Sequence, residues 1–172
     1  PFARLVKQIH HLGRNMVVVR DTSSPEEFPV NPRIDIWWSG QQLNIGLMLT
    51  LAFQLSKGGQ WANARIVLKR LIRNESERKE IHDFLKDYQQ ANRLDLELEI
   101  LIDDLPTPFE LIRKSSADAD LVLMGMKHPG AEESLEDYAD YYQHFMEETR
   151  DLPVVLVLCA EKIDFREIIG FG

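Results

Sequence analysis

The sequence predicts an α/β domain with three layers, in which a five-stranded parallel sheet lies between two layers of helices. Strand-like apolar segments and helix-like amphipathic segments alternate along the chain from Arg33 to Leu158. Parallel strands need crossover connections, and these are right-handed in nearly all proteins. We expect the strand order 3-2-1-4-5, because it places the third strand, which alternates apolar and charged residues, at an edge of the sheet. An extra helix and strand precede this repeat, within residues 1–20.

The first strand of the repeat is predicted at residues 33–38, Arg-Ile-Asp-Ile-Trp-Trp. Its side chains alternate between two faces, so the isoleucines lie on one face with Trp38, and Asp35 and Trp37 lie on the other. A short polar turn and a Leu-rich helix at about 42–56 follow, which is the beginning of a βαβ unit. Two adjacent tryptophans could stack a ring ligand, but they more often pack in the core or under a helix.

The rest of the chain repeats this alternation. Asn74 and Glu77 have the spacing of a helix capping box. In the segment 94–102, leucine or isoleucine stands at every even position and acidic residues stand at 95, 97 and 99, as in a strand with one solvent-exposed face. We expect strands at 64–72, 94–102, 119–125 and 152–158, and helices at about 74–92, 106–115 and 133–148.

The domain proper is expected to span residues 33–160, with other segments on either side. Apolar residues at three- and four-residue steps predict a helix at 2–12, and residues 15–20 are typical of a buried strand. No strand precedes this pair, so we interpret residues 1–20 as the remnant of a similar subdomain; the sequence leaves open which sheet they join. Residues 21–32 contain three prolines and are expected to form a linker. Residues 161–172 form a C-terminal tail with apolar residues that we expect to dock on another surface.

The formal net charge of −8 argues against nucleic acid as a partner, because a phosphate backbone requires clustered Lys and Arg. It also argues against docking on an anionic membrane. No segment has the roughly 18–20 apolar residues that cross a bilayer, and the first residues lack a signal-peptide pattern. We therefore expect a cytosolic chain that does not itself insert into the membrane. The single cysteine, Cys159, lies in an apolar strand and is expected to be a core residue.

No residue pattern indicates catalysis, a cofactor or a metal. The five histidines are scattered, and none pairs with a second ligand at zinc-site spacing. Asp103 and Asp104 could form an acid–base or metal pair, but adjacent residues point apart, and an exposed turn explains them better. Ligands of open parallel sheets bind beyond the carboxyl ends of the strands where the strand order switches. Here that point lies between strands 33–38 and 119–125, which makes His128 the titratable group of most interest.

An aromatic stripe at helical spacing, Tyr138, Tyr141 and Tyr142, is more often core or interface than a binding site. Together with Phe165, Ile168 and Ile169 of the tail, these residues are our candidate contact surface for another protein.

The loop after the fourth strand of the repeat contains Gly125 and Gly130 and resembles the phosphate-binding loop of the universal stress proteins. Nucleotide-binding members of that family show G-x2-G-x9-G-[ST]. In this chain an Asp-Tyr pair, residues 140–141, stands where the closing Gly-Ser would be expected. Glu132 and Glu133 would occupy the free N–H groups of the following helix and repel an anion. We therefore expect no cofactor, with Gly125 and Gly130 as the residues that a nucleotide would contact.

Several stretches from about 15 to 158 also resemble, in the right order, the cytosolic C-terminal domain of the cation-chloride cotransporters and related amino-acid permease-type transporters. The most specific match is Ile-Asp-Ile-Trp-Trp at 34–38 before a Leu-rich helix, where that family has I-D-V-W-W. Residues 61–72 resemble its W…[CA]-x-x-R-[IV] segment, and residues 148–157 resemble its closing L-[ST]-x-D-L-P-P-[VI]-L-L strand. Val154 replaces the second proline of that pattern.

This resemblance implies a non-catalytic regulatory and dimerisation domain at the cytoplasmic face of the cell membrane. It implies two subdomains with the universal stress protein fold, attachment to a transmembrane transport domain, and a homodimer. The alternative is a stand-alone universal stress protein that binds a nucleotide, and measured ATP binding would separate the two.

Overall fold

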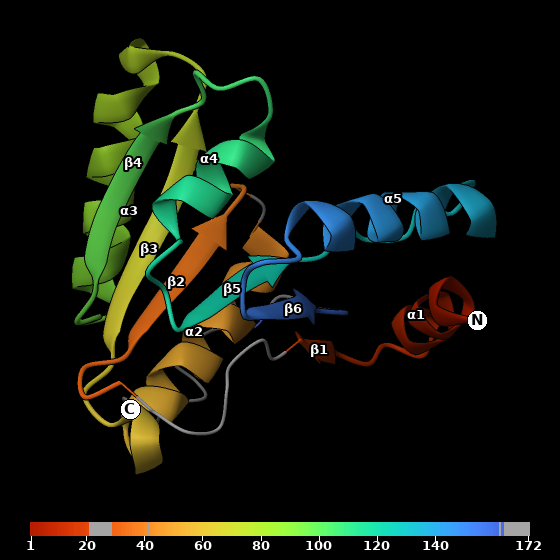
Figure 1. Ribbon diagram of the computed structural model, residues 1–172, viewed down its shortest axis with the longest axis horizontal. Coiled ribbons are helices and arrows are strands. Elements are labelled where there is room, and N and C mark those ends of the chain that lie inside the picture. The colour runs from red at the N-terminus through yellow and green to blue at the C-terminus, as the bar shows by residue number, and fades with distance from the viewer. Residues whose placement is uncertain (21–28, 41, 162, 164–172) are drawn as a thin grey trace.

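The computed structural model describes residues 1–20, 29–40, 42–161 and 163 (Figure 1). Eleven longer elements and two short 3-10 helices follow one another along these residues. In chain order they are α1 (Phe2–His11), β1 (Met16–Arg20), β2 (Arg33–Trp38), α2 (Gln42–Ser56), η1 (Gly59–Trp61), β3 (Arg65–Ile72), η2 (Glu75–Glu77), α3 (Arg78–Ala91), β4 (Glu97–Ile102), α4 (Pro108–Ser115), β5 (Leu121–Gly125), α5 (Leu135–Glu148) and β6 (Val154–Leu158).

The strands form one sheet in the order β1-β6-β5-β2-β3-β4 (Figure 1). The five strands β2 to β6 pair in parallel, and their order is the predicted 3-2-1-4-5, with β4 at an edge. The sixth strand, β1, pairs antiparallel with β6, and Val18 lies opposite Leu156. Residues 16–20 therefore extend this sheet, which answers the question that the sequence left open.

Helices cover the two faces of the sheet and enclose two apolar cores. One core lies under α2 and α3 and includes Ile34 and Ile36, and the other lies under α1, α4 and α5 and includes Trp37. The central strands β2 and β5 contribute to both cores, as their nearly continuous apolar sequences require. The predicted three-layer α/β architecture is thus confirmed, with one strand more than the repeat alone provides.

The boundaries of several elements differ by a few residues from the sequence prediction, and for two of them the reason is identifiable. The expected strand 94–102 begins at Glu97, because the Gln89 amide of α3 donates to the carbonyls of Leu94 and Leu96 and ties these residues to the helix. The helix expected from residue 133 begins at Leu135, since Ser134 caps it by accepting from the N–H of Asp137. The predicted capping box is present, with the N–H of Asn74 3.1 Å from a carboxylate oxygen of Glu77.

Some predictions fall outside the described residues. These are the linker residues 21–28 and the tail residues Phe165, Ile168 and Ile169. Among the helices that the structure describes, none combines the length and the apolar character needed to cross a membrane.

Candidate functional site

The switch in strand order lies between β2 and β5, and Asn44 of α2 fills the space beside it. The Asn44 amide donates to the carbonyl of Met126 at 3.0 Å, and its oxygen accepts from the N–H of Cys159 at 2.9 Å. A Cβ atom on Gly125 would lie 2.7 Å from the Asn44 nitrogen, so only glycine leaves room for this side chain. Gly125 thus accommodates Asn44, a buried residue that no sequence pattern singled out.

A side chain of the glycine loop after β5 binds one of the loop's own backbone N–H groups. One carboxylate oxygen of Glu133 accepts from the N–H of Gly130 at 3.0 Å, and the other pairs with the Lys127 ammonium at 2.5 Å. The hydrogen bond from Lys127, together with that from Gly130, lowers the pKa of Glu133. The Lys7 ammonium of α1 donates to the Glu133 carbonyl. A carboxylate therefore occupies the N–H of Gly130 that a phosphate would need.

His128 of this loop contacts α1 rather than an open crevice. Nδ1 of His128 lies 3.0 Å from Nε2 of His10, so one ring donates to the other. Within the part of the chain that the structure describes, Nε2 of His128 is buried without a hydrogen-bond partner. Burial, and to a lesser extent the neighbouring His10, lowers the pKa of His128. These surroundings therefore favour the neutral form of the His128 imidazole.

The predicted tyrosine stripe lies at the contact between α5 and α1. Tyr138 is fully buried, and its hydroxyl donates to the carbonyl of Lys127 at 2.9 Å. The ring of Tyr142 stacks on Phe2 with 4.0 Å between centroids, and the Lys127 ammonium lies 5.4 Å from the centroid of Tyr141. Burial raises the pKa of all three tyrosines. We call this contact, made by Phe2, Ala3 and Val6 of α1 and by the three tyrosines of α5, the α1–α5 seam.

Arg20, the last residue of β1, binds the carboxyl end of α5. Its guanidinium donates to the carbonyls of Met146 at 2.9 Å, of Thr149, and of Leu152 at 3.2 Å. The terminal carbonyls of a helix lack intrahelical partners and carry a partial negative charge, so a cation is well placed there. Arg20 thus links β1 to α5, the helix that packs on α1.

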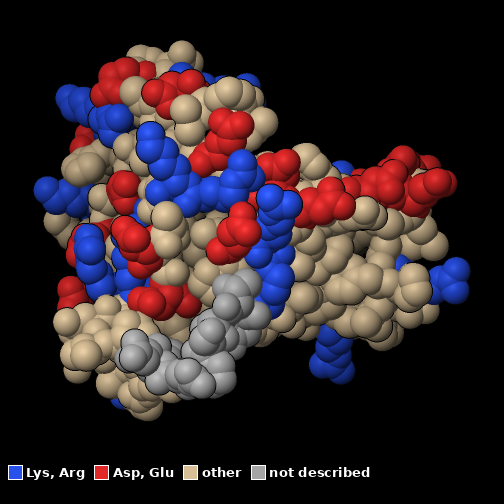
Figure 2. Space-filling model, viewed as in Figure 1, with Lys and Arg blue, Asp and Glu red and all other residues tan. Residues whose placement is uncertain are grey.

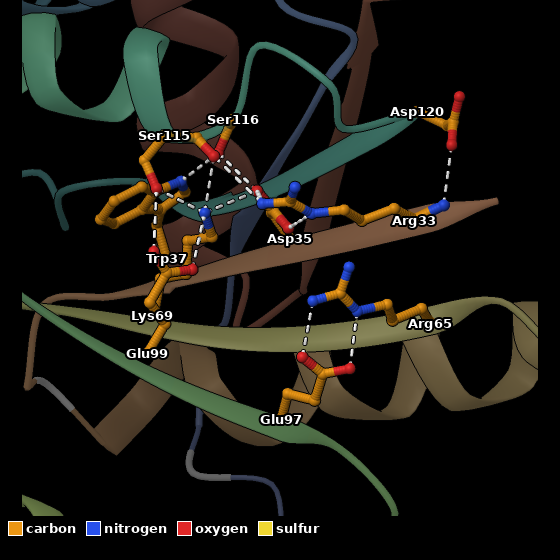
Figure 3. Close-up of polar contacts among 10 residues, drawn as sticks. All are labelled: Arg33, Asp35, Trp37, Arg65, Lys69, Glu97, Glu99, Ser115, Ser116 and Asp120. Atoms are coloured by element: carbon orange, nitrogen blue, oxygen red, sulfur yellow. Dashed lines mark hydrogen bonds and ion pairs between the residues drawn. The ribbon is translucent and has the colours of Figure 1, made fainter.

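A buried ion network occupies the sheet face below the end of α4 (Figure 3). Asp35 is fully buried and receives contacts from Arg33 at 2.8 Å, Lys69 at 3.1 Å and the Ser116 hydroxyl at 2.7 Å. Lys69, also fully buried, pairs in addition with Glu99 at 3.1 Å. Two cations thus face two carboxylates, and charges buried in this way are tolerated only when they are paired.

Lys69 and Ser115 have the residue types of a nucleophile and its base, but their contacts oppose that role. The Lys69 ammonium lies 2.5 Å from the Ser115 hydroxyl oxygen and 2.7 Å from its carbonyl. It also pairs with the carboxylates of Asp35 and Glu99. The ammonium is therefore the donor in each of these contacts and has no lone pair with which to accept the proton of the Ser115 hydroxyl. We interpret this network as structural. It was not foreseen from the sequence, because its members lie far apart along the chain.

The acidic residues beside the strands, including the predicted Asp103–Asp104 pair, make hydrogen bonds with neighbouring backbone groups. Asp103 and Asp104 follow β4, and Asp103 donates its N–H to the carbonyl of Ile72 at 2.8 Å. Asp120 accepts from the N–H of Arg33 at 2.7 Å. In the described residues, no three His, Cys, Asp or Glu side chains gather as a metal site would require.

Comparison with known proteins shows similarity of fold without detectable similarity of sequence. No protein-family model matches the chain, and no curated protein matches it. The cytoplasmic domain of a prokaryotic cation chloride cotransporter superposes with a TM-score of 0.67 at 13% identity and covers 97% of this chain. A universal stress protein in complex with cAMP gives a TM-score of 0.46 at 11% identity and covers 78% of this chain and 100% of that one.

The chain spans 61% of the length of the cotransporter domain that it matches. At such low identity the match concerns the fold alone. At that level it confirms the resemblance expected from the sequence: this chain has a fold similar to that of the cytoplasmic domain of a prokaryotic cation chloride cotransporter.

Proposed function

We propose that this chain is a non-catalytic regulatory domain at the cytoplasmic face of the cell membrane, in a secondary transporter related to the cation chloride cotransporters. The observation that carries the proposal is the likeness of fold, which extends over 97% of the chain. The switch-point loop supports it, because Glu133 and Asn44 use the backbone groups and the space that a nucleotide would require.

We further propose that residues 1–20 are the last helix and strand of a preceding subdomain with the same fold. The unit α1–β1 repeats the unit α5–β6, since each is a helix followed by a strand, and the two helices and the two strands pack on each other. The pairing is symmetric about Val18 and Leu156: Met16 lies opposite Leu158, and Arg20 lies opposite Val154. Two similar subdomains that met through their last strands would be related by a local two-fold axis of this kind.

Exposure along β1 supports the same proposal. Val155 and Val157 of β6 are 8% and 0% exposed beneath α2. Their partners across the ladder, Val17 and Val19, are 42% and 65% exposed. A preceding subdomain with the same fold would cover them with its own helix, as α2 covers their counterparts.

Charge distinguishes the two sides of the seam. Residues 1–20 contain four Lys and Arg residues and no acidic residue, whereas α5 is rich in Asp and Glu. In Figure 2, acidic side chains follow α5, and the charged side chains over α1 are basic. Opposite charges favour this pairing over the pairing of two acidic α5 helices. We therefore propose that Tyr138, Tyr141 and Tyr142 serve the contact between subdomains.

The complete reading frame tests the transporter assignment. We expect about ten segments of membrane-spanning length, followed by an α/β subdomain, upstream of Pro1. A start codon immediately before residue 1 would contradict both proposals.

Calorimetry with ATP at sub-millimolar concentration tests the alternative of a nucleotide-binding protein. We expect no saturable heat from the wild-type chain. A Glu133→Ala variant, which frees the N–H of Gly130, is the matched comparison. Saturable binding to the wild type would favour the stand-alone universal stress protein instead.

We also propose a homodimer, as the resemblance implies. The β6 edge is already paired with β1, so the dimer would use another surface. Light scattering on the complete protein is expected to give twice the monomer mass, and a monomer at working concentration would contradict this.

A further inference from the structure

An apolar pocket of about 220 Å³ opens where α2 and α3 cover β2 and β3, and its lining includes Trp38, Leu68, Phe84 and Tyr88. The rings of Phe84 and Trp38 stack with 5.7 Å between centroids, and those of Phe84 and Tyr88 with 6.4 Å. Phe84 is nevertheless 46% exposed. A concave, mostly apolar site with an aromatic wall that is partly open suits the apolar part of a small ligand.

A cation, Arg70, lies beside this aromatic wall. It follows Leu68 by two residues along β3, so the two side chains share a face of the sheet, and it lies opposite Trp38 in the ladder between β2 and β3. The central carbon of its guanidinium is 5.5 Å from the centroid of the Trp38 ring. A Cβ atom on Gly40 would come within 2.7 Å of this guanidinium, which therefore packs against the backbone just after β2.

Arg70 lacks an anionic partner among the residues that the structure describes. Its guanidinium donates to the carbonyl of Trp38 at 3.2 Å and is within ion-pair distance of no carboxylate in the described residues. Glu77 acts on it through charge alone, and the Glu77 carboxylate accepts from the N–H of Asn74 at 3.1 Å. Burial lowers the pKa of Arg70, because desolvation opposes the charged form. A partly buried cation without a paired anion is unfavourable, and a negative group on a ligand would compensate it.

We propose that this pocket binds a small organic carboxylate, with its apolar body against Leu68 and Phe84 and its carboxylate on the Arg70 guanidinium. A guanidinium presents parallel N–H donors that match the two oxygens of a carboxylate, and one cation balances its single charge. The pocket is smaller than the roughly 300–1,000 Å³ of sites for drug-sized ligands, so the body is one ring or a short aliphatic chain. The site is separate from the switch-point loop, and the proposal does not rest on the transporter assignment.

Two probes that differ only in the head group, 3-phenylpropionate and 3-phenylpropanamide, test the proposal on the complete chain. Each is titrated into the isotope-labelled protein, and the shifts of the backbone amide resonances give the dissociation constant and the place of binding. We expect the carboxylate to saturate on the order of 1 mM or below, with shifts in α3 and at the ends of β2 and β3. The neutral amide should bind at least about tenfold more weakly, because it lacks the charge-assisted hydrogen bonds. Equal affinities, or no saturable shift with either probe, would overturn the proposal.

Variants assign the two parts of the site. Arg70→Gln should reduce the affinity for the carboxylate to that for the amide and leave the amide unchanged, whereas an equal loss for both probes would mean that Arg70 only supports the pocket and would overturn the proposal. Phe84→Ala should weaken both probes by at least about threefold, since both contact the ring.

The matched controls are Arg150→Gln and Leu135→Ala. The Arg150 side chain is 79% exposed and Leu135 is 41% exposed. They lie after and within α5, which covers the other core, away from α3 (Figure 1). Neither substitution should change the affinity for either probe. Wild-type affinity in Phe84→Ala, or a loss in the controls as large as in the site variants, would place the binding elsewhere and overturn the proposal.

Discussion

Asp35→Asn provides the sharpest test of the buried ion network, because it removes one charge and almost no volume. Asp35 is 0% exposed and neutralises Arg33 and Lys69, and Lys69 is itself 0% exposed. After the substitution Lys69 retains one carboxylate, Glu99, which is 41% exposed and therefore partly screened by water. Breaking a buried pair by removing one partner costs about 3–5 kcal/mol. We expect a loss near the lower limit, about 3 kcal/mol, because Glu99 remains.

The matched control is Glu97→Gln on the same sheet face. Glu97 makes two hydrogen bonds with Arg65, at 2.6 and 2.7 Å, so its geometry is at least as good as that of Asp35. The two side chains are 55% and 57% exposed, however, and exposed pairs contribute only about 0–1 kcal/mol. The difference in stability loss between the two variants should therefore reflect the burial of the charged groups and not the geometry of their hydrogen bonds.

The assay is urea unfolding followed by circular dichroism at neutral pH, with the slope checked for two-state behaviour. A third variant, Asp35→Leu with Lys69→Met, replaces both charges by apolar groups. It should recover most of the stability lost by Asp35→Asn, because both fully buried charges are then removed. Arg33, which loses its carboxylate partner, is 20% exposed and keeps its hydrogen bond to the carbonyl of Ser115. Equal losses for Asp35→Asn and Glu97→Gln, or a double variant less stable than Asp35→Asn, would refute the reasoning.

Three further predictions concern α1, β1 and the core. Arg20→Ala should cost about 2–3 kcal/mol and increase hydrogen exchange in β1, because its charged donors bind the end of α5, whereas the exposed Arg14→Ala should have little effect. The pKa of His128 is lowered from 6.5, so the unfolded chain binds more protons below that pH. The stability it contributes should be complete above pH 6.5 and fall as the pH drops through the folded-state pKa, and His128→Gln should flatten this part of the pH profile. Burial raises the pKa of Cys159 to about 11. A thiol reagent at pH 8 should therefore label the unfolded chain within seconds and the native chain orders of magnitude more slowly, and fast labelling of native protein would place this thiol outside the core.

The alternation of strands and helices could be predicted from the sequence, because each element carries its own periodicity. Ile34 and Ile36 lie in one core and Trp37 in the other, as the period of two along β2 requires. The strand order followed from the alternation of apolar and acidic residues in β4, which indicates one solvent-exposed face and therefore a position at an edge of the sheet. These signals are local, because each of them lies within one short stretch of the sequence.

The candidate sites were harder to predict, because they depend on contacts between distant residues. The helical spacing of Tyr138, Tyr141 and Tyr142 shows that they share a face, but nothing in that spacing tells whether α1 or another protein lies against it. Asn44 has its partners at Met126 and Cys159, which are brought near only by the crossover between β5 and β6. For the same reason, no local pattern indicated that Asp35 would meet Lys69.

The antiparallel ladder between β1 and β6 has a mechanical consequence. A force applied along β1 loads all five residue pairs of this ladder at once, in shear, and Arg20 adds a tie to the neighbouring helix. Such a joint resists sliding far better than it resists peeling from one end. A pull on β1 along its own axis would therefore be transmitted to β6 and through it to the rest of the sheet.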